Sequence, residues 1–402
     1  NLALGTAIDG WGDMDTLISI ENIAGSQFGD QITGDNNANS LIGRGGNDTI
    51  IGGGGFDWLQ GGSGNDSLDG GGGYDIANYK NDEYDDISIT NSSIVAHLGA
   101  VSTVSDRWGN TDTLISIERV DGSDGDDVMS ADSGFAGTYG AFSEFQGMAG
   151  DDAISGNGST RISYFSSPDG IIANLSSAAF TFADPSTTTV GPNTVLDGWG
   201  GTDSIGSGIN SLHATYADDY VLGSSADEEI QLRGGNDWVD GGGGVDMLRY
   251  SAPGSVHVNL ADGITYNDGW GGVDTLFNIE NIRGGGNADT LTGDDGNNFI
   301  RGEGGNDLLQ GAGGDDDFWG GSGNDFIEGG DGINYMLGGA GDDTIIGGSG
   351  TGDYIYAGGN GEGAFDYDVA SFSDATGSIT ATLGAVATVS GAGVGTDTLS
   401  HI

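Results

Sequence analysis

Carboxylate or carboxamide side chains recur at steps of nine residues near the start of this chain. Each closes a glycine-rich loop, and the first series is Asp30, Asn39, Asp48, Asp57, Asp66 and Asp75. Gly43 to Ile51 reads GRGGNDTII and Gly61 to Asp69 reads GGSGNDSLD, so the loops follow the template G-G-x-G-x-D-x-U-x, where U is a large apolar residue. So short and regular a period predicts a repeat architecture in which each unit packs mainly against its neighbours.

The x-U-x half of each unit predicts a three-residue strand. Side chains alternate along a strand, so U points inward while its neighbours point outward, and each unit adds one residue to a thin core. Leu41, Ile50, Leu59 and Leu68 occupy that position. We expect two units to make one turn of a coil, so that loops eighteen residues apart stack at about the 4.8 Å spacing of neighbouring strands.

The loop half of each unit has the chemistry of a calcium site. Glycines permit turns with positive φ that let carbonyl oxygens converge, and the aspartate adds a hard anionic oxygen. A calcium ion, with oxygen ligands at about 2.3 to 2.6 Å, suits the space between two stacked loops better than magnesium, which requires about 2.0 to 2.1 Å and strict octahedral geometry. The sequence therefore predicts a ladder of calcium ions.

These repeats resemble those of the RTX (repeats-in-toxin, hemolysin-type) calcium-binding family, in particular the repeat region of a large secreted bacterial surface protein. The resemblance implies an all-β fold, a right-handed parallel β-roll interrupted here by small inserted β modules. The nine-residue register returns at Asp219, Glu228, Asp237, Asp246 and again at Asp289, Asn298, Asp307, Asp316, Asp325, Asn334 and Asp343.

The resemblance also implies which residues hold calcium. The loop-closing ligands are Asp48, Asp57, Asp66, Asp75, Asp152, Asp237, Asp246, Asp307, Asp316, Asp325, Asn334 and Asp343. The first glycines of the loops are Gly43, Gly52, Gly61, Gly70, Gly302, Gly311, Gly320, Gly329 and Gly338. Three loops match less well, because the segment SSADEE that contains Glu228 has no glycine, Asn334 carries no charge, and the loop ending at Asp353 has one extra residue.

A second repeating unit separates the loop blocks. Four copies of D-x-W-G-x-x-D-[TS]-[LI] occur, at Asp9 to Leu17, Asp106 to Leu114, Asp197 to Ile205 and Asp268 to Leu276; a fifth has Gly391 and Gly393 in place of the first Asp and the Trp. An aromatic residue and an alternating strand precede the motif, so we interpret these units as small β inserts that cover strand edges. The predicted inserts are 1–23, 79–120, 163–212, 250–282 and 366–402, and the predicted roll blocks are 24–78, 121–162 (degenerate), 213–249 and 283–365.

Composition restricts the possible partners. The chain has 61 acidic and 9 basic residues and a formal net charge of −52, which opposes compaction unless cations neutralise it and makes nucleic acid and anionic membranes improbable ligands. No cysteine is present, so disulfides and thiolate metal sites are excluded. No apolar stretch is long enough for a transmembrane segment. Loops of this kind need more free calcium than cytosol offers, so we expect an extracellular or cell-surface location.

We expect no enzymatic activity from this region. The four histidines, His97, His213, His257 and His401, form no H-E-x-x-H pair, and no G-x-S-x-G motif occurs. The repeated tryptophans Trp11, Trp108, Trp199 and Trp270 either pack each insert onto the neighbouring coil, which we favour, or form a platform for glycans. The paired aspartates of each insert, such as Asp197 with Asp203, could hold a further calcium ion, although two carboxylates fall short of its six to eight ligands.

The sequence therefore predicts a calcium-binding structural region that folds on calcium binding and forms a stiff segment of a surface, adhesin or matrix fibre, with self-association of neighbouring copies. The RTX resemblance implies type I secretion as an unfolded chain. The chain begins and stops inside an insert, so it reads as an excerpt of a longer protein. Two alternatives remain open: the non-catalytic tail of a secreted hydrolase or epimerase, and a carbohydrate-binding module that uses the repeated tryptophans.

Overall fold

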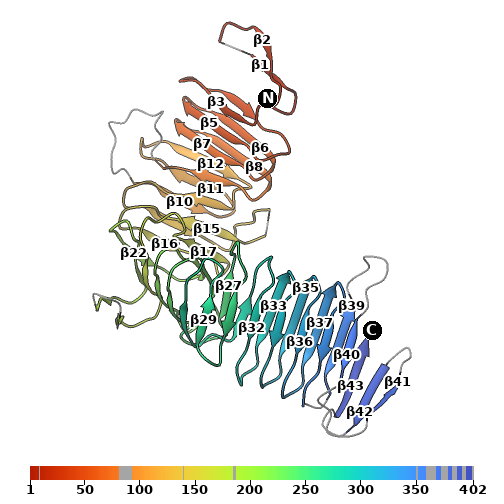
Figure 1. Cartoon of the computed structure of the whole chain (residues 1–402). Helices are drawn as coiled ribbons and strands as arrows, with labels where there is room; N and C mark the ends of the chain where they lie inside the picture. The colour runs from red at the N-terminus through yellow and green to blue at the C-terminus, as the bar shows by residue number, and fades with distance from the viewer. Residues whose placement is uncertain are drawn as a thin grey trace. The chain divides into compact units, whose positions relative to one another are not determined.

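A computed structural model (Figure 1) describes residues 1–8, 10–80, 93–138, 140–183, 187–349, 352–358, 368–372, 379–382, 387–391 and 395–400. Asp9, Gly393 and His401, which the sequence analysis singled out, lie outside these residues. The described residues form strands and turns, and no helix occurs among them. Consequently, this part of the chain has no helix that could cross a membrane. Contacts divide the chain into two compact units, residues 1–168 with 189–213 and residues 169–188 with 214–402.

The first unit contains short strands of two to seven residues. They are β1 Thr6–Ile8, β2 Met14–Thr16, β3 Asn22–Ala24, β4 Gln31–Thr33, β5 Ser40–Gly45, β6 Thr49–Gly55, β7 Trp58–Ser63, β8 Ser67–Gly73, β9 Ile76–Asn78, β10 Val95–Leu98, β11 Ser102–Ser105, β12 Thr111–Ile115, β13 Arg119–Asp121, β14 Val128–Ala131, β15 Ser143–Gln146, β16 Ala153–Ser155, β17 Thr160–Ser163, β20 Thr189–Val190, β21 Thr194–Leu196, β22 Thr202–Ile205 and β23 Ile209–His213.

The second unit is built from strands of similar length. They are β18 Ile172–Asn174, β19 Phe180–Thr181, β24 Tyr220–Leu222, β25 Glu229–Leu232, β26 Trp238–Asp240, β27 Met247–Tyr250, β28 His257–Asn259, β29 Ile264–Asn267, β30 Asp274–Phe277, β31 Asn281–Arg283, β32 Thr290–Thr292, β33 Phe299–Gly304, β34 Leu308–Gln310, β35 Asp317–Ser322, β36 Phe326–Glu328, β37 Tyr335–Ala340, β38 Thr344–Ile346, β39 Tyr354–Gly358, β40 Val369–Ser371, β41 Ile379–Thr382, β42 Ala387–Gly391 and β43 Gly395–Ser400.

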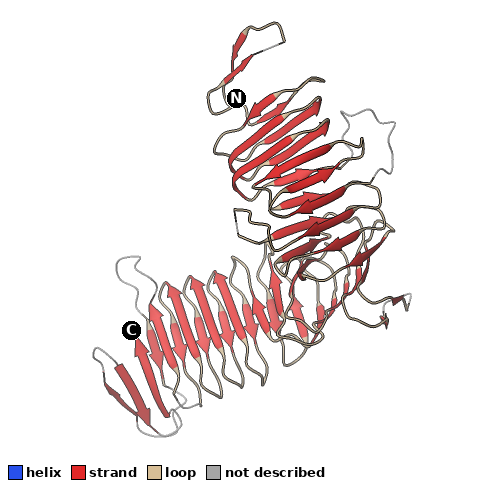
Figure 2. Ribbon diagram, turned by 180° about the vertical axis from the view of Figure 1, so that it is seen from behind, coloured by secondary structure: helices blue, strands red, loops and turns tan. Residues whose placement is uncertain are grey.

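Successive strands alternate between two parallel sheets, as the coil predicts. In one sheet of the first unit β4 pairs with β6 and β6 with β8, while β3, β5, β7 and β9 pair in the other. Partners such as Thr49 and Ser67 lie eighteen residues apart in the sequence. The same ladder runs through β32, β34, β36 and β38 and through β33, β35, β37 and β39 of the second unit, where Figure 2 shows the parallel rungs side by side. The expected all-β parallel β-roll is confirmed.

One apolar residue per nine-residue unit forms the core. Leu41, Ile50, Leu59 and Leu68 are completely buried. In the second unit the same positions are also completely buried, and their residues are Leu291, Ile300, Leu309, Phe318, Ile327, Met336 and Ile345. Because each strand has a single inward residue, the core is one side chain deep on each sheet, and each rung is supported chiefly by the rungs next to it.

The inserted segments extend the sheets rather than lying outside them. In the first unit β10, β11 and β12 form an antiparallel meander, of which β12 pairs parallel with β8 and β10 pairs parallel with β14. In the second unit β28, β29 and β30 do the same between β26 and β32. A three-stranded meander ends in the direction in which it began, so a parallel sheet can continue on both sides of it.

Replacing a core residue should cost far more than replacing an outward residue of the same roll. For Leu59→Ala we expect a loss of about 2–5 kcal/mol of unfolding free energy, because a completely buried side chain leaves a cavity. For Ile51→Ala, whose side chain is 37% exposed, we expect less than about 1 kcal/mol. Urea unfolding in calcium-saturated buffer measures both, and equal losses would contradict a core built from single inward residues.

Candidate metal centres

The loop-closing side chains form a hydrogen-bonded ladder along the roll. The backbone N–H of Asp30 donates to Asp48 Oδ1 at 2.7 Å, and that of Asp48 donates to Asp66 Oδ1 at 2.8 Å. All twelve predicted loop-closing ligands, from Asp48 to Asp343, accept such a bond through Oδ1 from the loop-closing residue of the preceding coil. One oxygen of each side chain therefore joins one coil to the next.

The other carboxylate oxygen has no such role. In ten of the predicted aspartates Oδ2 is buried and accepts no hydrogen bond within the described part of the chain: Asp48, Asp57, Asp66, Asp75, Asp152, Asp237, Asp246, Asp307, Asp316 and Asp325. A buried anionic oxygen without a partner is costly, because it loses its hydration and gains nothing in return. This repeated pattern calls for a cation.

The first glycine of each loop leaves the space into which this oxygen points. A Cβ atom on Gly43 would lie 2.2 Å from Asp48 Oδ2 and 2.5 Å from the carbonyl oxygen of Gly61 in the next coil. A Cβ on Gly302 would lie 2.1 Å from Asp307 Oδ2 and 2.7 Å from the Gly320 carbonyl oxygen. Corresponding contacts occur at Gly52, Gly311 and Gly320. At Gly70 the carbonyl oxygen is that of Ser116, and at Gly329 the amide nitrogen of Asn334 stands in place of a carboxylate oxygen. Carboxylate and carbonyl oxygens from two coils thus converge where a side chain would otherwise stand.

The second residue of the loop distinguishes two kinds of loop. In most loops with a bare Oδ2 this residue has a left-handed backbone, even where it is not glycine, as at Arg44 (φ 80°), Met148 (φ 73°), Glu303 (φ 78°) and Ala312 (φ 74°). Non-glycine residues adopt this conformation at a cost of about 1–3 kcal/mol. We call a loop open when the Oδ2 atom of its closing carboxylate accepts no hydrogen bond, and most open loops contain this strained turn.

In closed loops the second residue donates its backbone N–H to the loop-closing side chain. Ser26 donates to Asp30 Oδ2 at 2.6 Å, and Thr215 donates to Asp219 Oδ2 at 2.8 Å. The other closed loops end at Asn39, Asp127, Glu228, Asp289 and Asn298. All seven are the first or second loop after a predicted insert, so an internal hydrogen bond satisfies the side chains at the start of each block.

Two loops depart from the template in informative ways. The loop before Asp237 begins with Leu232 and Arg233 instead of glycines, yet Asp237 Oδ2 is bare. Asp353, which follows the loop with one extra residue, still takes its place in the ladder, because Asn334 N–H donates to Asp353 Oδ1 at 2.9 Å across nineteen residues. Sequence reasoning left Asp353 out of the ligand set. A Cβ atom on Gly347 would lie 2.6 Å from Asp353 Oδ2, so Gly347 has the same place in its loop as the other first glycines.

Insert residues finish the ladder at the end of a block. Asp66 N–H donates to Asp112 Oδ1 at 2.8 Å, and the Tyr79 hydroxyl donates to Asp112 Oδ2 at 2.9 Å. Asp75 N–H, in the other row of loops, donates to Glu118 Oε2 at 2.9 Å. Burial, together with the Asp112 carboxylate, raises the pKa of Tyr79 well above its ordinary value, so the phenol remains a donor. The hydrogen bond between Tyr79 and Asp112 therefore holds the start and the end of the insert together.

Burial disfavours the charged form of the open carboxylates. Desolvation is the largest cause at each and raises the pKa of Asp48, Asp75 and Asp307 to about 7. For Asp152 burial, followed by the charge of Asp203, raises the pKa to about 9. For Asp237 burial, with Asp219 and Asp274 nearby, raises the pKa to about 10. These carboxylates need a proton or a cation at neutral pH.

The donor set suits calcium. No group of three or more His, Asp or Glu side chains suited to a metal occurs among the described residues, so an ion here must also use backbone carbonyls. Calcium accepts mixed carboxylate and carbonyl oxygens in irregular numbers, whereas transition metals favour nitrogen or sulfur ligands. The open loops of the roll therefore fit the predicted ion.

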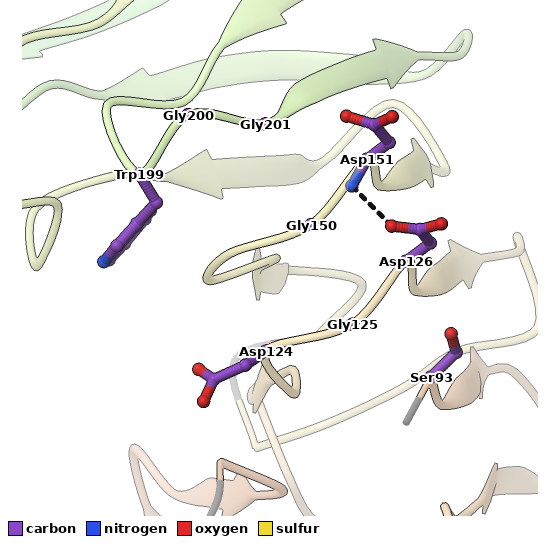
Figure 3. A pocket seen from close by; sticks show the side chains of 9 residues that line it. All are labelled: Ser93, Asp124, Gly125, Asp126, Gly150, Asp151, Trp199, Gly200 and Gly201. Carbon is purple, nitrogen blue, oxygen red and sulfur yellow. Dashed lines mark hydrogen bonds between the residues drawn. The ribbon is translucent and has the colours of Figure 1, made fainter. Parts of the chain in front are cut away.

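The repeated tryptophans have different surroundings. Trp11 is 90% exposed, whereas the Trp270 ring meets the Tyr216 ring edge-on at 5.1 Å. The Arg107 guanidinium lies 4.2 Å from the centre of the Trp108 ring. Trp199 lines a hollow of about 370 Å³ beside Asp124 and the stacked loops of Gly125, Gly150 and Gly201 (Figure 3). Trp108 and Trp270 contact neighbouring side chains, but Trp270 is still 45% exposed, so the packing role and the glycan platform both stay predictions.

The comparison with protein families agrees with this geometry. The family "RTX calcium-binding nonapeptide repeat (4 copies)" matches residues 19–50, 42–77, 117–135, 213–248, 283–318 and 319–354. No curated protein matches the sequence. Among solved structures, the extracellular lipase LipA from Serratia marcescens is similar at 20% identity, over 48% of this chain and 38% of the lipase chain, with a TM-score of 0.17.

Filling the space beside an open carboxylate should remove one ion. We expect Gly302→Ala to lower the number of calcium ions bound per chain by one, because the new methyl group would occupy the point where Asp307 Oδ2 and the Gly320 carbonyl converge. Gly243→Ala is the matched control, since a Cβ there would meet no atom within 4 Å. Equilibrium dialysis with ⁴⁵Ca measures both, and identical counts would contradict this placement of the ions.

The metal-free protein should become more stable as the pH falls. Burial raises the pKa of the open carboxylates above their ordinary value of 3.8, to about 7 at Asp48, about 9 at Asp152 and about 10 at Asp237. They therefore contribute stability that is complete below pH 4 and lost as the pH rises through these folded-state pKa values. Circular dichroism of calcium-free protein between pH 9 and pH 5 should show a growing β signal at the lower end. A signal that weakens steadily on acidification would refute buried, uncompensated carboxylates.

Proposed function

The chain is an RTX repeat protein with calcium-binding nonapeptide repeats between residues 19 and 354, and from this premise we propose that it is an extracellular structural segment that calcium binding converts from an extended chain into stiff, folded β-roll units. One observation carries the proposal: the rows of buried Oδ2 atoms without partners, at aspartates such as Asp57 and Asp316. Bound calcium would supply the positive charge that these oxygens lack.

Folding and ion binding are coupled because no single loop makes a site. Asp48 Oδ2 converges with the carbonyl oxygen of Gly61, which lies in the next coil. The unfolded chain does not hold these two loops together, so the free energy of ion binding contributes directly to folding. Without cations the folded roll must bring together carboxylates of a chain whose net charge is −52.

This coupling supports secretion before folding. A strongly anionic chain with empty sites remains extended where calcium is scarce, and the unfolded form suits passage through a narrow export channel. Outside the cell the calcium concentration is high enough to drive folding by mass action. We therefore place the folded protein outside the cell or at its surface, with type I secretion as its route.

A surface, adhesin or matrix fibre is the structural role that we propose. The rungs of each unit stack in register through β-ladders, loop hydrogen bonds and shared ion sites, so bending a unit would break several interactions at once. Copies of the same protein are its proposed neighbours.

We propose that the segment is not catalytic. Among the described histidines, His97 comes closest to a catalytic arrangement, because Nδ1 lies 3.1 Å from Ser130 Oγ and Nε2 lies 3.3 Å from an Asp132 carboxylate oxygen. However, the Ser130 hydroxyl donates to the backbone carbonyl of Ala96, which leaves Ser130 Oγ as the acceptor from the imidazole. That direction is the reverse of what activates a serine nucleophile. The contact is better explained by the pairing of His97 with Ser130 across β10 and β14.

Chelation should unfold the protein reversibly. We expect excess EDTA at pH 7.5 to abolish the far-UV β signal and calcium to restore it, because the ions hold successive coils together. Magnesium at the same concentration should restore much less of the signal, since it tolerates neither the longer distances nor the irregular ligand number. An unchanged spectrum after complete removal of calcium would overturn the proposed function.

A further inference from the structure

The inserts that lie between roll blocks each contribute a loop that takes the place of a nonapeptide in the stack. The insert loop Asp197 to Asp203 follows the roll loop that ends at Asp152, although fifty-one residues separate Asp152 from Asp203. Asp152 N–H donates to Asp203 Oδ1 at 3.0 Å, which is the bond that joins successive roll loops elsewhere. The strands that follow, β16 and β22, pair in parallel.

The backbone of this insert loop approaches the roll as a nonapeptide would. A Cβ on Gly201 would lie 1.9 Å from the Gly150 carbonyl oxygen. In the regular roll a Cβ on Gly323 would lie 1.7 Å from the carbonyl oxygen of Gly305 in the preceding coil. Figure 3 shows Gly201 beside Gly150, with Gly125 of the previous loop next in the stack. The insert loop is therefore stacked in register on the last roll loop.

The second aspartate of the insert is fully engaged. Asp203 Oδ1 accepts the Asp152 N–H, and Asp203 Oδ2 accepts the Tyr164 hydroxyl at 2.8 Å. The pairing of Asp197 with Asp203 that the sequence suggested therefore does not describe a shared ion.

One carboxylate oxygen of Asp197, the first aspartate of the insert, accepts no hydrogen bond within the described residues. Asp197 Oδ1 accepts the N–H groups of Trp199, Gly200 and Gly201 at 2.8 to 2.9 Å, and these bonds shape the turn. Asp197 Oδ2 is buried and accepts no hydrogen bond within the described residues, and the side chain as a whole is 0% exposed. A Cβ atom on Gly201 would lie 2.7 Å from Asp197 Oδ2, and it would also contact the Gly150 carbonyl oxygen.

The roll loop on which the insert is stacked also carries a buried oxygen without a partner. It is Asp152 Oδ2, and its residue is joined to the insert loop by the bond from Asp152 N–H to Asp203 Oδ1. The roll alone accounts for Asp152, because it closes a nonapeptide loop. It does not account for Asp197, which belongs to the insert.

The second unit repeats this arrangement at Asp268. Asp268 Oδ1 accepts the N–H groups of Trp270, Gly271 and Gly272, and its Oδ2 is buried without a partner. A Cβ on Gly272 would lie 1.7 Å from the Gly235 carbonyl oxygen and 2.6 Å from Asp268 Oδ2. The adjoining roll residue is Asp237, whose Oδ2 is also bare.

The insert loop that begins at Asp106 differs in one respect. Asn110 stands where the other two loops have Gly201 and Gly272, and its side-chain amide donates to Asp106 Oδ2 at 3.4 Å. The chain therefore contains an internal comparison, in which an amide group closes one loop and the other two remain open.

From this pattern we propose that the insert loops at Asp197 and Asp268 each complete an additional calcium site, at the junction with the roll residues Asp152 and Asp237. The donors are two carboxylates and a backbone carbonyl, from Gly150 in one unit and Gly235 in the other. Two carboxylates and a carbonyl in an irregular arrangement favour calcium over magnesium. The proposal rests on the proposed function of the roll and adds the inserts to its ion-binding elements.

The test is the number of calcium ions bound by single and double variants of the full chain. Asp197→Asn and Asp268→Asn keep the Oδ1 acceptor that shapes the turn and replace the bare anionic oxygen with an amide. We expect each variant to bind one calcium ion fewer than the unmodified chain and the double variant to bind two fewer, measured by equilibrium dialysis with ⁴⁵Ca. Asp106→Asn is the control and should leave the count unchanged, because its oxygen is already closed by Asn110.

The outcomes separate this proposal from the proposed function. If the unmodified chain binds calcium and both variants bind the same number, the junction sites are refuted while the roll sites stand. If the unmodified chain binds no calcium, the proposed function fails as well. Circular dichroism in saturating calcium should show the same β signal for all three single variants. A variant that lost this signal would be replaced by Asp197→Ser or Asp268→Ser, which retains an oxygen acceptor, and an undiminished ion count there would equally refute the site.

Discussion

The structure depends on how each loop-closing carboxylate divides its two oxygens. Oδ1 accepts a backbone N–H from the preceding coil and so fixes the distance and register between coils. Oδ2 is turned into its own loop, where the first glycine leaves room and a carbonyl from the next coil approaches. The same side chain therefore builds the stack and leaves one buried charge per open loop. That charge makes a metal-free roll unfavourable at neutral pH and makes stability depend on cations.

The loops fall into two classes because of a competition for Oδ2. In a closed loop the N–H of the second residue occupies this oxygen, as Ser123 N–H does at Asp127. In most open loops the second residue turns into the left-handed region, and non-glycine residues such as Arg44 and Glu303 do so despite the cost. Closed loops occur at the start of a block, so the first coil after an insert satisfies its carboxylates internally. Ion binding then adds stability to the coils that follow.

The inserts show how a repeat can be interrupted without breaking its stack. Each of the meanders β10–β12 and β28–β30 has an odd number of strands, so the sheet leaves it with its direction preserved. In the inserts that lie between roll blocks, the motif D-[TS]-[LI] supplies the loop-closing aspartate and the inward apolar residue of a nonapeptide, as Asp112 and Leu114 do. A tyrosine from the start of the insert closes that aspartate, as Tyr79 does. The last loop and strand of the insert thus take the place of one nonapeptide in the roll.

The nine-residue period by itself determined the parallel roll, the inward positions such as Leu59 and Phe318, and the aspartates whose oxygens converge on the glycines, because alternation along a strand and repetition along the chain are local properties. Only the tertiary structure decided which carboxylates stay open. Three hydrogen bonds depend on groups that the coil or a loop conformation brings together. They join Ser26 to Asp30, Tyr164 to Asp203, and Asn334 to Asp353. The state of a buried oxygen is set by its neighbours in space, and the repeat pattern records only its neighbours in sequence.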